Sequence, residues 1–245
     1  MKAEEIEMWE KHYLDYMTFM LTNDKTKMIN ALNSKDEIKD DWIGAFQKKS
    51  CDIDRGAERI YFWLFNSLGI PNSTPIGSDL LYETNNAFIH VDVKTSSFYT
   101  IDSRTDQKKK NRSDFLGVVS IGHNQTSYEY IDNRGVLHSA NLPAIYKSKN
   151  KLCLTYIIQL VYDKADDGNL IILALLLICV PNGILKSIYK DEICGGSKNA
   201  TEAFRYYYKR RPKFEKINGK PYRFNLLYLH PNFENKSEEI IGFKI

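Results

Sequence analysis

The stretch SDLLYETNNAFIHVDVKT, residues 78–95, decides how the rest of the chain is arranged. Its first part, residues 78–83, is short and mostly apolar, and residues 84–86 (TNN) carry the small polar side chains typical of a turn. The second part, residues 87–95, alternates apolar and polar positions and is rich in β-branched side chains. The stretch therefore predicts two antiparallel strands joined by a tight turn.

Three charged side chains meet in this predicted hairpin. Asp92 and Lys94 are two positions apart, so strand alternation puts them on one face and Val93 on the other. The turn brings Asp79, on the first strand, opposite the neighbourhood of Asp92. Two close carboxylates repel each other unless a cation lies between them, and Mg²⁺ prefers such oxygen ligands while retaining waters. A lysine beside them can stabilise a developing oxyanion or activate a water, which is the chemistry of phosphodiester hydrolysis.

The alternative interpretation makes Asp92 and Lys94 solvent-facing residues of a half-exposed strand. The segment AFIHVDVK is otherwise apolar and is typical of a central strand, where charged side chains need a reason. His90 lies on the expected face of Asp92 and is interpreted as a packed strand residue rather than a metal ligand.

The extended stretch GSDLLYETNNAFIHVDVKT, residues 77–95, resembles the PD-(D/E)XK nuclease motif, especially as found in type II restriction endonucleases. In that family an Asp on one strand is followed, after a variable spacer, by (D/E)XK on the next. Here twelve residues separate Asp79 from Asp92. Thr95, after the lysine, is also common in the family, whereas Ser78 stands where the family has proline.

The resemblance implies roles for these residues. Asp79 and Asp92 would bind Mg²⁺, with the main-chain carbonyl of Val93 as a further ligand. Lys94 would orient or activate the attacking water. Family members often carry a further acid on the preceding helix, for which Glu58 in RGAERIYFW is the candidate. The implied fold is α/β, a central mixed β-sheet flanked by helices with a restriction-endonuclease-like core.

The remaining sequence fits this fold as a single endonuclease domain over residues 1–245. Two long apolar runs, 152–162 and 170–180, predict strands that are covered on both faces, with a turn at 164–169 between them. A catalytic core is expected over 54–180, beginning with a helix at 54–69 and interrupted by a polar excursion at 98–150. Residues 181–245 form the expected DNA-contact region.

Residues 1–50 are expected to be helical and amphipathic. The positions expected to pack on the core as an apolar stripe are Met8, Trp9, Tyr13, Tyr16, Met17 and Met20.

A basic, aromatic segment runs from Gly195 to Lys220. Between Lys198 and Lys220 it holds eight Lys or Arg and two acids, and aromatic residues are interleaved with them. Such a run is often only a solvated face, but beside a nuclease motif it favours contact with DNA phosphates. A second basic cluster, residues 107–112, is interpreted as a loop. The candidate DNA-binding residues, including possible base readers, are Asn124, Gln125, Lys198, Asn199, Arg205, Lys209, Arg210 and Arg211.

Several other function classes are excluded. The longest apolar run, residues 170–180, is too short to span a bilayer, and the N-terminus lacks the apolar region of a signal peptide. No Walker loop or GxGxxG motif is present, so a nucleotide cofactor is not expected. The four cysteines form no CxxC pair, and Cys153 and Cys179 lie inside apolar runs as expected core residues. This cysteine pattern indicates a reducing, cytoplasmic location. His123 and Asn124 resemble the start of a histidine-metal nuclease motif, but no matching histidines follow downstream, so that class of nuclease is not expected.

The sequence therefore favours a type II restriction endonuclease that hydrolyses double-stranded DNA at specific sites with Mg²⁺. The alternatives are a repair or junction-resolving nuclease of the same fold and a non-catalytic DNA-binding module. The complete acidic pair with Lys94 argues against the module. The excursion at 98–150 and the basic segment suit sequence recognition, which favours the restriction enzyme. A palindromic target would imply a two-fold homodimer.

Overall fold

The computed structural model describes residues 1–33, 78–101, 108–110, 117–164, 170–197, 202–208 and 223–236, together with Arg210 and Glu238. The helix expected at 54–69 and its Glu58 lie outside these residues, as does most of the turn expected at 164–169. No helix of the described ranges is both long and apolar enough to cross a membrane.

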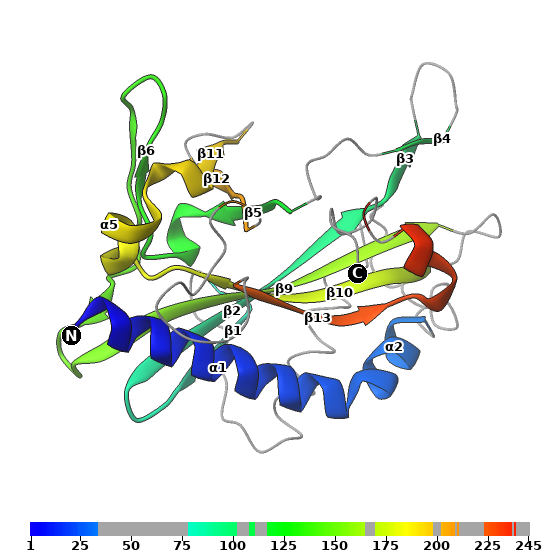
Figure 1. The fold of residues 1–245 in the computed structure, drawn as a ribbon, viewed down its shortest axis with the longest axis horizontal. Helices are drawn as coiled ribbons and strands as arrows, with labels where there is room; N and C mark the ends of the chain where they lie inside the picture. The colour runs from blue at the N-terminus through cyan, green and yellow to red at the C-terminus, as the bar shows by residue number, and fades with distance from the viewer. Residues whose placement is uncertain are drawn as a thin grey trace, which may run out of the picture.

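A mixed central sheet organises the described chain, as the sequence predicts (Figure 1). Its strands are β1 (Leu80–Glu83), β2 (Ala87–Ser97), β8 (Ile145–Tyr146), β9 (Lys151–Lys164), β10 (Leu170–Val180) and β13 (Phe224–Leu229). They are ordered β1-β2-β9-β10-β13, and β8 pairs with the start of β9. The β2–β9 pair is parallel and the others are antiparallel. Asp92 and Lys94, on β2, therefore lie on a strand with neighbours on both sides.

The predicted hairpin of β1 and β2 is confirmed, with Leu80 opposite Val91 and Glu83 opposite Phe88. Thr84 closes the turn: its backbone N–H donates to the carbonyl of Ala87 at 2.8 Å, and its hydroxyl accepts from the Ala87 N–H at 3.0 Å. The register of every later contact in the site depends on this turn, because a slip of one residue would move each side chain of β2 to the other face.

Helices cover one face of the sheet. α1 (Ala3–Asn23) runs along β9, β10 and β13, and α2 (Lys25–Asn33) continues from it (Figure 1). The predicted apolar stripe is right for Tyr13, Met17 and Met20, which are buried. It is wrong for Met8 and Tyr16, which are each 47% exposed. The face that packs on the sheet is rotated away from those two side chains and includes two acids instead.

A buried ion pair joins α1 to Arg223, the residue before β13. The carboxylate of Glu10 pairs with the guanidinium of Arg223, and both side chains are fully buried. The other Glu10 oxygen accepts from the backbone N–H of Asn182 at 2.7 Å. Tyr189 donates to Glu7 at 2.6 Å and accepts from Arg223 at 3.0 Å, so the charges share one network. Charges without water need such partners, which fixes where α1 lies along the sheet.

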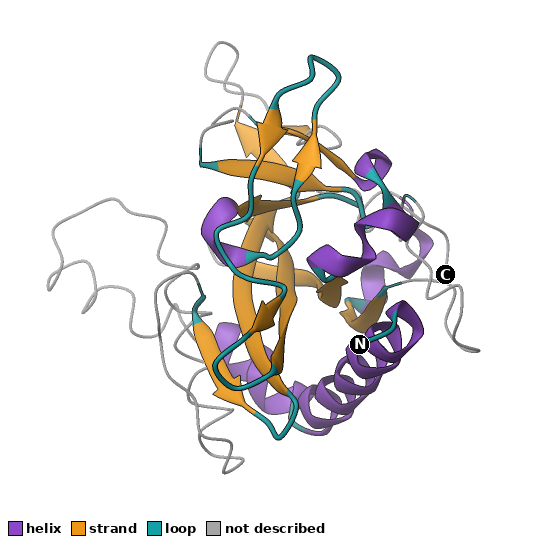
Figure 2. Cartoon of the chain, turned by 90° about the vertical axis from the view of Figure 1, so that its left-hand side faces the viewer, coloured by secondary structure: helices purple, strands orange, loops and turns teal. Residues whose placement is uncertain are grey.

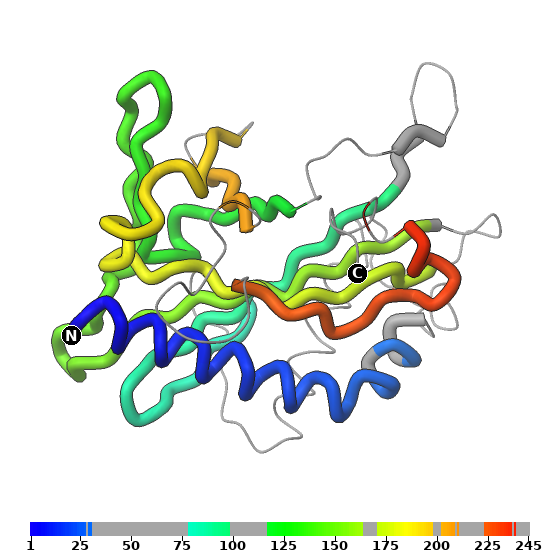
Figure 3. Tube along the Cα trace, in the orientation of Figure 1, coloured from blue at the N-terminus to red at the C-terminus, as the bar shows by residue number. Residues whose placement is uncertain are grey.

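A smaller layer covers the opposite face. This smaller layer (Figure 1) consists of β5 (Val119–Gly122), η2 (His123–Gln125), β6 (Tyr130–Ile131), β7 (Leu137–His138), η3 (Gly183–Leu185), α5 (Lys186–Tyr189), η4 (Asp191–Ile193), β11 (Cys194–Gly196) and β12 (Ala203–Tyr206). The remaining short elements are β3 (Tyr99–Ile101), β4 (Lys108–Lys110) and η5 (Pro231–Lys236). β12 lies between β11 and β5 in a three-stranded sheet (Figure 3). Figures 1 and 2 place the β6–β7 hairpin and α1 on opposite sides of the central sheet.

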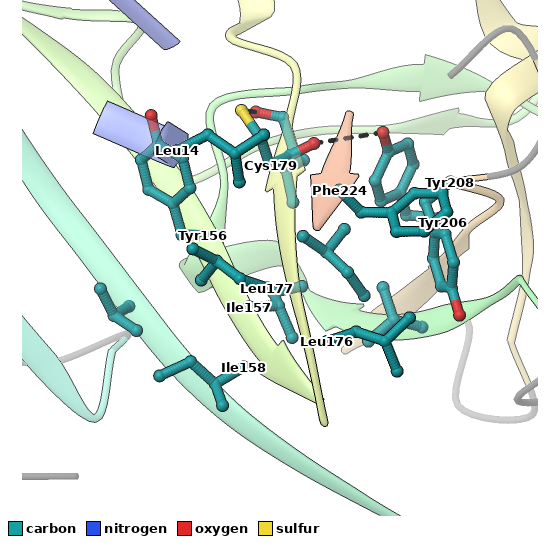
Figure 4. Close-up of a cluster of buried hydrophobic side chains, with 14 of the residues drawn as sticks. Leu14, Tyr156, Ile157, Ile158, Leu176, Leu177, Cys179, Tyr206, Tyr208 and Phe224 are labelled. Carbon is teal, nitrogen blue, oxygen red and sulfur yellow. Dashed lines mark hydrogen bonds between the residues drawn. The ribbon is translucent and has the colours of Figure 1, made fainter. Parts of the chain in front are cut away.

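The core lies on both faces of β9 and β10, which confirms that these apolar strands are covered twice. Figure 4 shows Leu14 and Tyr156 on one side of β10, with Tyr206 and Tyr208 on the other. The Tyr206 hydroxyl donates to the carbonyl of Cys179 at 3.2 Å, so the smaller layer is also hydrogen-bonded to the sheet. Cys153 and Cys179 are fully buried free thiols, as expected of core residues.

We predict that Glu10→Gln destabilises the fold by about 3–5 kcal/mol, because Arg223 would keep its charge in a fully buried position without a counter-charge. The glutamine preserves side-chain volume and an acceptor for Asn182. The free energy of unfolding in urea measures the effect. Asp24→Asn, which removes the partner of the 74% exposed Lys27 side chain, is the control and should change stability by less than about 1 kcal/mol. A Glu10→Gln loss as small as that of the control would contradict the role of the buried pair.

Candidate active site

Asp79 continues the β1–β2 ladder with its side chain. It lies immediately before β1, and the register that pairs Leu80 with Val91 puts Asp79 opposite Asp92. Its Oδ2 accepts a hydrogen bond from the backbone N–H of Val93 at 2.6 Å. Beyond the pair of Leu80 and Val91, the Asp79 carboxylate thus accepts the hydrogen bond that a backbone carbonyl would accept within the ladder. This contact holds Asp79 beside Asp92, as the hairpin predicts.

Asp92 is a carboxyl group removed from water. It is 3% exposed, and its Oδ1 accepts from Nε2 of Gln125 at 2.6 Å. Its Oδ2 lies 2.5 Å from Nζ of Lys94. Burial raises the pKa of Asp92 to about 7, the Lys94 ammonium opposes this rise, and the neighbouring Asp79 adds to it. With both carboxyl groups ionised, the site would hold more negative charge than Lys94 alone compensates.

Lys94 marks the place where β2 emerges from the interior. Residues 89–93 are buried, and residues 94–97 are partly exposed. The Lys94 side chain is 30% exposed while it contacts a 5% exposed Asp92 side chain. A substrate in solvent can therefore reach the ammonium, while the carboxylate stays in surroundings of low polarity that strengthen its interactions.

The oxygen-rich pair of Asp79 and Asp92 fits a hard divalent cation. Among the residues that the structure describes, no three His, Cys, Asp or Glu side chains gather closely enough to hold a metal ion. Mg²⁺ does not need such a cage, since it is usually bound through one or two carboxylates, several waters and phosphate oxygens of the substrate. The raised pKa of Asp92 supports the fit, because a bound cation would offset the charge that burial disfavours.

His90 extends the same face of β2 but takes no part in this pair. Its ring is 3% exposed, it stacks on Tyr146, and its Nε2 lies 3.0 Å from the Tyr146 hydroxyl. Burial lowers the pKa of His90 to about 4, so the ring is neutral at ordinary pH. These contacts agree with its interpretation as a packed strand residue.

Gln125 lies in a place that sequence reasoning did not anticipate. It was expected to contact DNA, and the structure instead places its side chain on Asp92. Its amide oxygen accepts from the backbone N–H of Gly122 at 2.7 Å, so both ends of the amide are engaged inside the protein. Nothing in the local sequence signals this contact, because Gln125 and Asp92 are 33 positions apart.

The DNA-binding candidates that the structure describes gather on or beside the smaller layer. Asn124 is exposed on η2, next to Gln125. Arg205 lies on β12, opposite Gly195 and Ser120. The Arg210 guanidinium stacks over the ring of Tyr207, 4.0 Å from its centroid. Lys198, Asn199, Lys209 and Arg211 lie outside the described residues.

The chain matches two profiles of one protein family. The first, described as the N-terminal domain of the type II restriction enzyme MwoI, matches residues 2–167, and the second, the central domain of the same enzyme, matches residues 172–229. The two matches meet between β9 and β10, which are neighbours in one sheet. A search of curated protein sequences finds no match.

Solved structures share the fold. One is the tetrameric restriction endonuclease SfiI bound to cognate DNA, with 15% identity, a TM-score of 0.66, and coverage of 95% of this chain and 87% of that one. Another is the restriction endonuclease BglI bound to its DNA recognition sequence, with 12% identity, a TM-score of 0.64, and coverage of 92% and 91%. At these identities the comparison confirms the predicted fold and leaves residue roles to the geometry of this chain.

We predict that Asp92→Asn stabilises the metal-free protein at about pH 8, and that this gain shrinks to about a third at pH 5. The folded-state pKa of about 7 lies above the usual value of 3.8, so folded Asp92 keeps a proton that the unfolded chain has released. Stability from this group therefore falls as pH rises from about 4 to about 7, and the amide escapes that loss.

Melting temperatures in the presence of a chelator measure the effect, at about 2–4 °C for each kcal/mol in a chain of this size. Equal gains at the two pH values, or a loss at the higher one, would show that Asp92 ionises as an ordinary exposed carboxyl does.

Proposed function

We propose that this chain, which belongs to the family of type II restriction enzymes represented by MwoI, cleaves DNA at the site formed by Asp79, Asp92 and Lys94. The family makes the chain an endonuclease that hydrolyses DNA. The observation that carries the assignment of the site is the convergence of two carboxyl groups and one ammonium at the solvent end of β2. Membership in a family of restriction enzymes favours this function over a repair nuclease or a non-catalytic module.

Mg²⁺ is the proposed cofactor. Enzymes of this type generally depend on a divalent metal ion. The carboxylates of Asp79 and Asp92, with the main-chain carbonyl of Val93, offer oxygen ligands alone, which suits Mg²⁺ better than a softer metal. When bound, the ion would polarise a phosphoryl oxygen and lower the pKa of a coordinated water. Glu58 is kept as a further acidic residue of this site on the family resemblance.

The protein side chains position the reactants. Hydrolysis joins a water oxygen to phosphorus and breaks one phosphorus–oxygen bond, while the attacking water loses a proton and the departing oxygen gains one. Lys94 is the group that can approach the phosphate or the attacking water, because its ammonium is partly exposed and lies at the edge of the carboxylate pair. The contact with Asp92 holds the Lys94 ammonium at this place.

The smaller layer is the proposed DNA surface. Asn124 is exposed one residue from the side chain that contacts Asp92, so a duplex that reaches the active site also passes close to η2. Arg205 on β12 and Arg210 beyond it supply positive charge to the same layer. Phosphate contacts from such side chains fix the position of the duplex, and base-edge contacts supply sequence preference. Lys198, Asn199, Lys209 and Arg211 belong to this proposal by sequence.

A homodimer is the proposed active assembly. One chain contributes one pair of carboxyl groups with one lysine, which is one site for the cleavage of one DNA strand. A two-fold dimer on a palindromic site would present one such site to each strand. The time course of plasmid cutting checks this: two sites acting together give linear DNA directly, whereas accumulation of nicked circles would favour a chain that acts alone.

We predict that the protein with Mg²⁺ cuts a plasmid into discrete fragments, and that Lys94→Ala slows cutting by about 10²–10⁴-fold while binding to the same DNA is retained. The reason is that Lys94 acts on the reacting groups, whereas duplex affinity comes mainly from phosphate contacts over a wider surface. Fragment patterns on gels and binding in Ca²⁺ measure the two properties separately.

Lys149→Ala is the matched control for Lys94→Ala. It removes one ammonium from the far end of the hairpin, where Glu83 retains Lys151 as a partner. Its cutting rate should equal that of the natural protein. A smear of products would exclude sequence-specific cutting, and a Lys94→Ala variant that cuts at the natural rate would remove Lys94 from the site.

We predict that Arg205→Ala weakens DNA binding and lowers the slope of log affinity against log salt by about 1, because one phosphate contact is lost. Binding at several salt concentrations measures the slope. Lys27→Ala is the control, since this exposed lysine pairs with Asp24 on the helical side of the sheet, opposite the smaller layer. A slope that is unchanged in Arg205→Ala, or lowered equally in both variants, would place the DNA surface elsewhere.

A further inference from the structure

Gln125 joins the excursion to Asp92 on β2. Its Nε2 donates to Oδ1 of Asp92 at 2.6 Å, and its Oε1 accepts from the backbone N–H of Gly122 at 2.7 Å. The orientation of the amide follows from its partners. A backbone N–H can only donate, so the amide oxygen faces Gly122, and the amide nitrogen is left to face the carboxylate.

The backbone of Gln125 is held as firmly as its side chain. The hydroxyl of Thr155, on β9, donates to the Gln125 carbonyl at 3.0 Å. Thr155 is the register partner of His90 on β2, one side-chain position along the same face from Asp92. The turn η2 is thus attached both to the strand that carries the site and to its parallel neighbour.

Gly122 provides the room for this arrangement. A Cβ atom at Gly122 would lie 2.6 Å from Oδ1 of Asn124 and 3.2 Å from Oε1 of Gln125. The first distance is shorter than real contacts allow, so even a methyl group at Gly122 would turn the Asn124 amide away and shift the Gln125 amide, and a larger side chain would displace Gln125 further. The absence of a side chain there permits the turn that aims Gln125 at Asp92.

The two oxygens of Asp92 consequently have different partners. Oδ1 is taken by a neutral donor with a fixed direction, and Oδ2 faces Lys94. Since a hydrogen bond to one oxygen fixes the rotation of the whole carboxylate, Gln125 decides which way the remaining acceptor sites of Asp92 point. Partners of this kind orient metal-binding side chains in proteins, and their loss typically weakens metal affinity or activity by about 10–100-fold.

We propose that Gln125 is a positioning residue of the active site, which holds the Asp92 carboxylate in the orientation that binds the divalent cation. The inference rests on the proposed function, since it assigns to Asp92 the role of a metal ligand. It adds to that function a residue from outside the hairpin, so the excursion at 98–150 contributes to the catalytic centre itself.

The test measures Mn²⁺ binding to the protein without DNA, followed by water-proton relaxation, together with the Mg²⁺ concentration that gives half-maximal cleavage. Gln125→Met keeps the length of the side chain and removes the donor. We expect Mn²⁺ affinity to fall by about 10–100-fold and the Mg²⁺ midpoint to rise in parallel, with DNA binding in the presence of a chelator unchanged. Asn141→Met, an exposed amide of the same excursion, is the control and should behave as the natural protein does.

Gly122→Val is the second variant, whose branched side chain crowds the Gln125 amide while Gln125 itself and the central sheet are unchanged. It should weaken Mn²⁺ binding in the same direction, and it keeps the inference testable if Gln125→Met fails to fold. A natural Mn²⁺ affinity in either folded variant would overturn the positioning role.

Asp92→Asn separates this inference from the proposed function. If Asp92→Asn loses Mn²⁺ binding while Gln125→Met keeps it, only the role of Gln125 is refuted. If Asp92→Asn binds Mn²⁺ as the natural protein does, the metal role of Asp92 fails, and the proposal for Gln125 fails with it.

Discussion

The burial of β2 on both faces is the constraint on which the rest of the site depends. A central strand excludes water from Asp92, and a carboxyl group in that position needs partners. The hairpin supplies Asp79 and Lys94, and the excursion supplies Gln125. The loop-rich part of the chain is thereby tied to the central sheet, because it completes the surroundings of a single buried oxygen pair. Burial and the neighbouring Asp79 both disfavour the ionised form of Asp92, and a bound cation would offset that cost.

Two buried carboxyl groups show how one physical problem has two outcomes in this molecule. Burial raises the pKa of both Glu10 and Asp92. Glu10 pairs with a fully buried arginine and accepts a hydrogen bond from a backbone N–H. Both of its oxygens are thus bonded within the protein, and the pair holds α1 against the sheet. Asp92 instead lies beside a second acid, Asp79, and a partly exposed lysine, Lys94. When ionised, the two carboxylates are not fully compensated by one ammonium, and solvent reaches the Lys94 side of the pair. The first arrangement is structural, and the second leaves a place for a metal ion.

The comparisons and the geometry support different parts of the functional conclusion. Family membership makes the chain a type II restriction enzyme, and the two profile matches meet between strands that pair in one sheet. The solved neighbours share the fold at 15% and 12% identity, which is too distant to transfer the role of a side chain. The roles of Asp79, Asp92, Lys94 and Gln125 are therefore argued from distances within this chain. The placement of Arg210 is likewise argued from contacts within this chain: Gly195 leaves space for the ring of Tyr207, and the Arg210 guanidinium stacks on that ring.

The sequence by itself determined the features encoded over a few residues. Strand alternation and the TNN turn predicted the hairpin, the shared face of Asp92 and Lys94, and the meeting with Asp79, while unbroken apolar runs predicted strands covered twice. Only the tertiary structure decided which distant side chains answer the buried charges. Arg223 meets Glu10 across 213 positions and Gln125 meets Asp92 across 33, and no local periodicity records such pairs. The same reason explains why the apolar spacing of α1 misjudged Met8 and Tyr16: spacing identifies an amphipathic helix, but the packed sheet selects which of its faces is buried.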